Sequence, residues 1–192
     1  MRLRSGRWRG AFCGLRLLLL ATACWPGLPA AAAEPASTKE YEVKAAFLYN
    51  FTKFVEWPEE KFAATNSPIV IGVLGRNPFG TALEEMIKNR KVNGRGIQLK
   101  QIDSVAEVPG LHVLFVSNGD SERFAGLADA LQEGSVLGVG ESEALLKRGG
   151  AIMFALEGDK VRFELDINSA ERARLKISAQ LQKLARKVRG KS

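Results

Sequence analysis

The chain has 192 residues, of which 28 are Lys or Arg and 21 are Asp or Glu, for a formal net charge of +7. Five of the basic residues are arginines that precede Leu17, whereas no acidic residue precedes Glu34. The positive charge is therefore concentrated in a leader, and the remaining 23 basic and 21 acidic residues argue against nucleic-acid binding.

The leader has the three parts of a secretory signal: the arginine-rich start, an apolar run at 17–24 and small residues at 30–33. The apolar run is far shorter than the roughly 20 residues that span a bilayer. We therefore predict a signal peptide over 1–33, cleaved near Ala33, and one domain over 34–192 in the periplasm. Two alternatives stay open, namely an uncleaved anchor and a lipoprotein in which Cys24 is acylated.

Both cysteines, Cys13 and Cys24, lie in the leader, so the predicted domain contains neither a disulfide nor a thiol nucleophile. Its only histidine, His112, lies in an apolar segment. A zinc site needs several convergent ligands, and a serine-type triad needs a histidine beside an exposed serine. We interpret His112 as a core or pocket residue, and we expect no enzymatic activity, no metal and no cofactor.

The first predicted helix begins at a capping box, Ser37-x-x-Glu40, and ends near Trp57-Pro58. Its apolar face repeats at helical spacing through Val43, Phe47, Phe51 and Phe54.

Strands then alternate with helices, which is typical of a largely parallel sheet. Apolar or alternating runs predict strands at 69–74, 97–102, 112–116 and 136–139. The segments at 81–89, 123–131 and 143–147 predict helices. Two further strands, 151–156 and 161–165, flank the hairpin turn signal Gly158-Asp159.

The last predicted helix is capped by Asn168-x-x-Glu171. Its buried stripe comprises Ala170, Ala173, Ile177, Leu181, Leu184 and Val188. We therefore expect a single compact three-layer α/β domain. Its mostly parallel sheet should end in a C-terminal antiparallel hairpin strand pair, followed by a long final helix.

A ligand crevice is expected beyond the carboxyl ends of the parallel strands. Candidate ligand-binding residues there are Arg76 and Asn77 after strand 69–74, and Ser117 and Asn118 after strand 112–116. With Arg95 and His112 they suggest a site for an anionic or aromatic metabolite. The loop at 72–80 lacks a phosphate-binding motif, and a solvated Arg76 on a tight turn is the alternative.

Three aromatic residues, Tyr41, Tyr49 and Trp57, lie off the apolar stripe of the first helix, and exposed aromatic side chains often anchor protein interfaces. The last predicted helix carries Arg172 and Lys176 on one basic side. That side is typical of a solvated face, or of a contact with an acidic partner or lipid head groups.

The domain resembles the YfiR family in a series of segments that occur in the same order. They are Tyr41 to Pro58, His112 to Val116, Val136 to Val139, Gly149 to Ile152, Phe163 to Asn168 and Leu175 to Ser178, completed by Leu181, Leu184 and Ala185. The residue before the strand histidine is often cysteine in that family, whereas it is Leu111 here. Redox control through a disulfide is therefore not expected.

The resemblance implies a non-catalytic periplasmic regulator with a compact α/β fold that tends to form a homodimer. It implies that the protein binds the periplasmic sensor part of an inner-membrane diguanylate cyclase, or of another sensor such as a histidine kinase, and represses it. It also implies an outer-membrane lipoprotein that sequesters the repressor. The alternative is a small-molecule-binding accessory protein for a sensor kinase or transporter.

Overall fold

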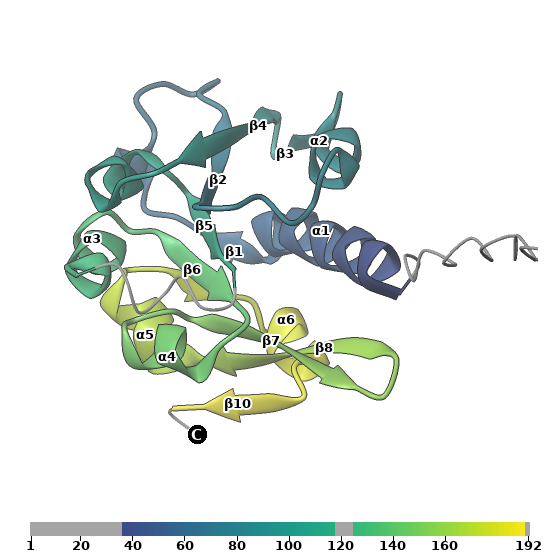
Figure 1. Ribbon diagram of the computed structural model, residues 1–192. Helices are drawn as coiled ribbons and strands as arrows, with labels where there is room; N and C mark the ends of the chain where they lie inside the picture. The colour runs from purple at the N-terminus through teal and green to yellow at the C-terminus, as the bar shows by residue number, and fades with distance from the viewer. Residues whose placement is uncertain (1–35, 118–124, 191–192) are drawn as a thin grey trace, which may run out of the picture. The chain divides into compact units, whose positions relative to one another are not determined.

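The computed structural model describes residues 36–117 and 125–190 (Figure 1). The strands are β1 (Val55–Glu56), β2 (Ile69–Leu74), β3 (Lys91–Val92), β4 (Arg95–Ile102), β5 (Val113–Val116), β6 (Leu137–Gly140), β7 (Ile152–Glu157), β8 (Lys160–Asp166), β9 (Lys176–Ile177) and β10 (Lys187–Arg189). The α-helices are α1 (Ala36–Phe54), α2 (Ala82–Ile87), α3 (Leu127–Glu133), α4 (Glu143–Lys147), α5 (Ile167–Arg172) and α6 (Ala179–Leu184). Two 3₁₀ turns, η1 (Glu59–Lys61) and η2 (Val105–Gly110), complete the elements.

The main sheet has the strand order β10-β8-β7-β6-β5-β2-β4-β3. Its central strands β4, β2, β5, β6 and β7 all pair in parallel, whereas β8 returns antiparallel to β7. Such parallel strands are covered on both faces, which explains their continuous apolar sequences. The predicted mixed sheet with a late antiparallel hairpin is confirmed.

One face of the sheet is covered by α1, α2, α5 and α6. The side chain of Phe51 on α1 is fully buried, and its ring lies 5.9 Å from that of Phe154 and 5.3 Å from that of Phe163. Aromatic pairs at these separations add to the stabilisation from burial. Val43 departs from the predicted apolar face, because 44% of it remains exposed.

The other face is covered by η2, α3 and α4, whose leucines approach the strands closely. Three strand glycines each lie against a leucine of this layer: Gly72 against Leu111, Gly138 against Leu131 and Gly140 against Leu145. A side chain at these strand positions would occupy the space that the leucines fill. The result is the predicted three-layer arrangement.

The long final helix is not present, and the segment forms α5, β9, α6 and β10 instead. The helix ends because Arg174 adopts a φ of 59°, in the left-handed region. A new helix begins at Ser178, whose Oγ accepts a hydrogen bond from the amide of Leu181. Asp166, rather than the predicted Asn168, caps α5.

Strand pairing explains why the apolar stripe was misleading. β9 pairs with β1 in a small second sheet, and β10 pairs with β8. Leu184 and Val188, which the helical period predicted to be buried, are 59% and 41% exposed.

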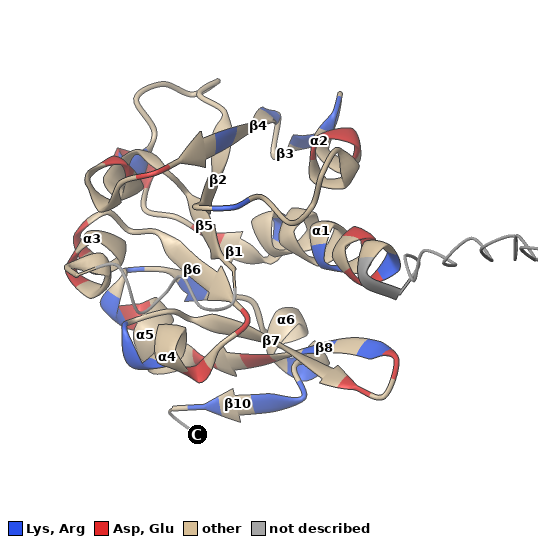
Figure 2. Ribbon diagram, viewed as in Figure 1, with Lys and Arg blue, Asp and Glu red and all other residues tan. Residues whose placement is uncertain are grey.

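Ion pairs anchor β10 to the sheet. The carboxylate of buried Glu164 accepts hydrogen bonds from Arg186 at 2.6 Å and from Arg189 at 2.7 Å. Burial alone would raise the pKa of Glu164, but the hydrogen bonds and the positive charges of the two arginines together outweigh it and hold the pKa below its ordinary value. Figure 2 shows the resulting basic strand at the edge of the sheet.

Within residues 36–117 and 125–190, no helix has both the length and the apolar character needed to cross a membrane.

The close approach of helix and strand can be tested at Gly140. A Cβ there would lie 2.5 Å from Leu145 Cδ2 and 2.7 Å from the carbonyl oxygen of Val116. Gly140→Ala should lower the free energy of unfolding by about 1–3 kcal/mol, because the backbone oxygen has no room to move. Gly96→Ala, whose Cβ would meet no atom within 4 Å, is the matched control and should change it by less than about 0.5 kcal/mol. Equal urea-denaturation midpoints for the two variants would contradict this packing.

Candidate binding cleft

The residues predicted to bind a ligand lie at two opposite ends of the sheet. Arg76 and Asn77 follow β2 and Ser117 follows β5, so all three lie at the carboxyl ends of parallel strands. Asn77 Oδ1 accepts a hydrogen bond from the amide of Phe79, and Ser117 Oγ donates to the carbonyl oxygen of Arg76 at 3.3 Å. These bonds shape the turn after β2. Asn118 lies outside the described residues.

Arg95 and His112 lie at the amino ends of β4 and β5, at the opposite end of the sheet. The expected single crevice is therefore wrong, because the strand order separates the two groups. Both ends contain a cavity: one of about 420 Å³ beside Arg76 and Asn77 at the carboxyl end, and one of about 460 Å³ beside Arg95 at the amino end.

His112 is a buried residue, as expected, with 5% of its surface exposed. Its Nδ1 accepts a hydrogen bond from the amide of Val70 at 3.1 Å, so the neutral ring carries its proton on Nε2. Burial, together with the positive charges of Lys61 and Arg95, lowers the pKa of His112 to about 4. The ring is consequently neutral at ordinary pH.

Aromatic and cationic groups surround this histidine. The ring of Phe62 stacks on that of His112 at 4.6 Å, and the indole Nε1 of Trp57 donates to the carbonyl oxygen of His112 at 3.0 Å. The guanidinium of Arg95 lies 3.8 Å from the centroid of Phe62. It also donates to the carbonyl oxygens of Ala64 and Ser67, each at 2.9 Å, which fixes its position.

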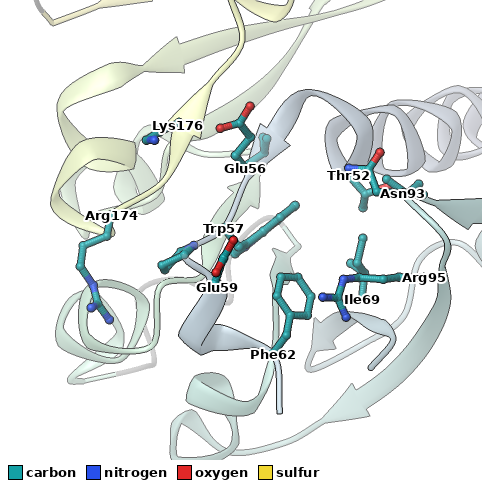
Figure 3. A pocket seen from close by; sticks show the side chains of 13 residues that line it. Thr52, Glu56, Trp57, Glu59, Phe62, Ile69, Asn93, Arg95, Arg174 and Lys176 are labelled. Carbon is teal, nitrogen blue, oxygen red and sulfur yellow. The ribbon is translucent and has the colours of Figure 1, made fainter. Parts of the chain in front are cut away.

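A cleft of about 460 Å³ opens beside these rings (Figure 3). Figure 3 shows Trp57 and Phe62 between Arg174 on one side and Arg95 on the other. The lining residues are Thr52, Val55, Glu56, Trp57, Pro58, Glu59, Phe62, Ile69, Val92, Asn93, Arg95, Arg174 and Lys176. Aromatic walls with fixed cations suit a ligand that has an apolar body and an anionic group.

The short sheet of β1 and β9 builds one wall of the cleft. It pairs Glu56 with Lys176, and Arg174 lies just before it, with its Nη1 3.1 Å from the Glu60 carboxylate. Sequence reasoning missed this wall because the basic residues were assigned to one helix. The aromatic Phe62, in the loop before β2, was missed because no periodic pattern surrounds it.

The five residues predicted to bind a partner do not share one surface. Trp57 and Lys176 line the cleft, whereas Arg172 lies on α5. Tyr49 is 8% exposed, under the cations of Lys53 and Arg90, so its predicted exposure is wrong. The common basic side of a final helix is absent because that helix is broken.

Tyr41 lies near the start of α1, at the carboxyl end of the sheet. Its ring packs edge-on against Phe79 at 5.5 Å. Burial and the carboxylate of Glu141 raise the pKa of Tyr41 to about 12. The neighbouring Lys44 is buried and pairs with both Glu40 and Glu141, an ion-pair cluster that the sequence pattern did not indicate.

The buried histidine predicts a loss of stability in acid. The unfolded chain takes up a proton at His112 below pH 6.5, whereas the folded chain does so only near pH 4. His112 should therefore stabilise the folded chain at pH 7, and the free energy of unfolding should fall by up to about 3 kcal/mol as the pH falls from 6.5 to 4. His112→Asn, which retains a hydrogen-bond acceptor for Val70, should flatten this part of the stability curve in urea unfolding between pH 7 and pH 4. An unchanged slope would show that the imidazole titrates normally.

Comparisons with known proteins agree with this architecture. No functionally curated protein matches the chain. A conserved domain protein from Vibrio cholerae O1 biovar eltor strain N16961 is similar in structure, with a TM-score of 0.50 and 10% identity over 78% of this chain. This chain spans 60% of the length of that protein, and the likeness extends to the fold alone.

A second solved structure, the ABC domain from Streptococcus pneumonia in complex with L-Trp, matches with a TM-score of 0.45 and 13% identity. The match covers 62% of this chain and 55% of that one.

The family comparison covers most of the described fold. The YfiR/HmsC-like family (DUF4154) matches residues 41–186, which include all but the start of α1 and every element through α6. The chain therefore belongs to the YfiR/HmsC-like family, whose members are periplasmic regulators.

Proposed function

We propose that this protein is an exported, non-catalytic repressor that binds the periplasmic sensor part of an inner-membrane diguanylate cyclase and holds the cyclase inactive. The observation that carries the proposal is the family match over residues 41–186, because the family is a regulatory one. The secretory signal over 1–33, cleaved near Ala33, would deliver the domain to the compartment where such a sensor is exposed. An outer-membrane lipoprotein that sequesters the repressor, and assembly as a homodimer, belong to the same proposal.

The character of the predicted domain supports a binding role. The leader carries both cysteines, and the only histidine is buried, neutral and engaged by the amide of Val70. Regulation would then depend on a surface contact that changes the population of active cyclase. The domain would act by binding the inactive state of the sensor more tightly than the active state.

Deleting the gene should raise intracellular cyclic diguanylate and biofilm formation, because the cyclase would lose its repressor. The measurement is nucleotide quantification by mass spectrometry in the wild-type, deletion and complemented strains. Complementation with the full chain should restore the low level. A deletion strain with unchanged cyclic diguanylate would contradict the proposed partner and favour another sensor, such as a histidine kinase.

A second candidate function is suggested by the cleft beside Trp57 and Phe62. Its volume of about 460 Å³ and its cations, Arg95, Arg174 and Lys176, suit a small anionic metabolite with an aromatic or apolar body. In that case the protein would be an accessory binding protein for a sensor kinase or transporter.

Ligand binding at the cleft can be measured by thermal shift, since a compound that binds only the folded state raises the Tm. Aromatic carboxylates and organic phosphates are the probes. For any compound that raises the Tm, Lys176→Met should weaken the affinity about tenfold, which corresponds to 1.4 kcal/mol of binding free energy. Lys88→Met removes an exposed lysine outside the cleft and should leave binding unchanged. A panel without any stabilising compound, or equal affinities for the two variants, would count against a ligand in this cleft.

A further inference from the structure

The strand β4 has an open edge over most of its length. On one side, residues Ile97 to Ile102 pair with β2. On the other side, β3 pairs only with Arg95 and Gly96 and then leaves the sheet. Between Ile97 and Gln101, no strand among the described residues occupies the outer side of β4.

Two contacts fix which backbone groups point outward. Arg95 pairs with Val92 across the two-residue turn to β3, so the backbone of Arg95 faces away from β2. Ile102 faces β2, because its carbonyl oxygen accepts a hydrogen bond from the amide of Gly75 at 3.1 Å. Successive residues of a strand alternate in direction. The N–H and C=O groups of Ile97, Leu99 and Gln101 therefore point to the open side.

The open edge carries an apolar strip. The side chains of Ile97 and Leu99 are half-buried and pack with Met86 against the core. A strand laid beside β4 would cover this strip with its own alternate side chains while it satisfied the outward backbone groups. This is the arrangement of peptide recognition by strand addition.

The charge beside the edge selects the kind of strand. Lys88, Arg90 and Lys91 are exposed where β3 leaves β4, and none of them forms an ion pair with a described residue. Figure 2 shows basic positions around the turn between α2 and β3, whereas the acidic positions nearby lie on α2 itself, where Glu84 and Glu85 are exposed. An incoming strand with acidic side chains would be attracted to the basic positions.

A second copy of the chain fits this edge poorly. In an antiparallel pair centred on Leu99, Ile102 of the second copy would lie opposite Gly96, where Lys91 already lies. A pair centred one residue further along would place two copies of Lys100 directly opposite each other, and like charges in that position are destabilising. The edge is therefore suited to a different protein.

We propose that the open edge of β4, from Ile97 to Gln101, is the docking surface for an extended acidic segment of the partner sensor protein. This inference rests on the proposed repressor function and names the surface that performs it. The segment would join the sheet as an additional strand, with about five residues of β4 in contact over roughly 17 Å.

Two variants test the edge and leave the backbone hydrogen bonds between β4 and β2 in place. Gln101→Pro removes an outward N–H, a change that edge strands accommodate. It also removes the side-chain hydrogen bond from Gln101 Nε2 to the carbonyl oxygen of Gly75, so its Tm is compared with that of the wild type. Lys91→Glu reverses a charge beside the edge and leaves the backbone unaltered. Lys187→Glu, which makes the same charge change on β10 at the opposite edge, is the matched control.

Each variant is expressed as the full chain in the deletion strain, and cyclic diguanylate is measured together with periplasmic abundance and the Tm of the purified protein. We expect wild type and Lys187→Glu to repress fully, and both edge variants to bind at least about tenfold more weakly and leave cyclic diguanylate near the deletion level. Edge variants that are folded, abundant and fully repressing would overturn the docking surface while leaving the proposed function intact. A wild-type chain that does not lower cyclic diguanylate would overturn both.

Discussion

The architecture depends on burying both faces of a parallel sheet with side chains of very different size. On the α1 side the space is filled by aromatic rings such as Phe51 and Phe154. On the other side the strands carry glycines, which allow Leu131 and Leu145 to approach the backbone. Within this packed sheet, the strand order decides which strand ends meet and which edge stays open. The amino-end cleft and the open edge of β4 are consequences of that order.

The sequence predicted the parts of this fold in which local pattern and tertiary packing agree. The strand 69–74 and the helix 143–147 were predicted with the bounds that the structure shows, because the strand is one continuous apolar run and the helix is a short segment with charged residues at both ends. The prediction of a long final helix was wrong because the apolar residues there repeat at helical spacing, whereas β1 and β8 provide strands with which the segment pairs. Arg174 breaks the helix by adopting a left-handed conformation. The sequence does not predict this conformation, because arginine rarely adopts it.

The candidate site was only partly predictable for a related reason. Arg95 and His112 were selected, but they were grouped with Arg76, which lies at the opposite end of the sheet. Strand direction and order decide which side chains meet, and neither can be read from a single segment. The stack of Arg95 on Phe62 and of Phe62 on His112 joins three separate segments. The histidine in this stack adjoins the cleft, and it is neutral chiefly because it is buried.

The central claim is that the exported domain represses a cyclase from the periplasmic side. The most direct measurement adds the protein, purified from the periplasm, to sphaeroplasts of the deletion strain, whose inner membrane is open to the medium on its periplasmic face. Intracellular cyclic diguanylate is then followed as the protein concentration rises. Repression by binding predicts a saturable fall to the wild-type level. Cyclic diguanylate that stays constant at saturating protein would contradict the claim.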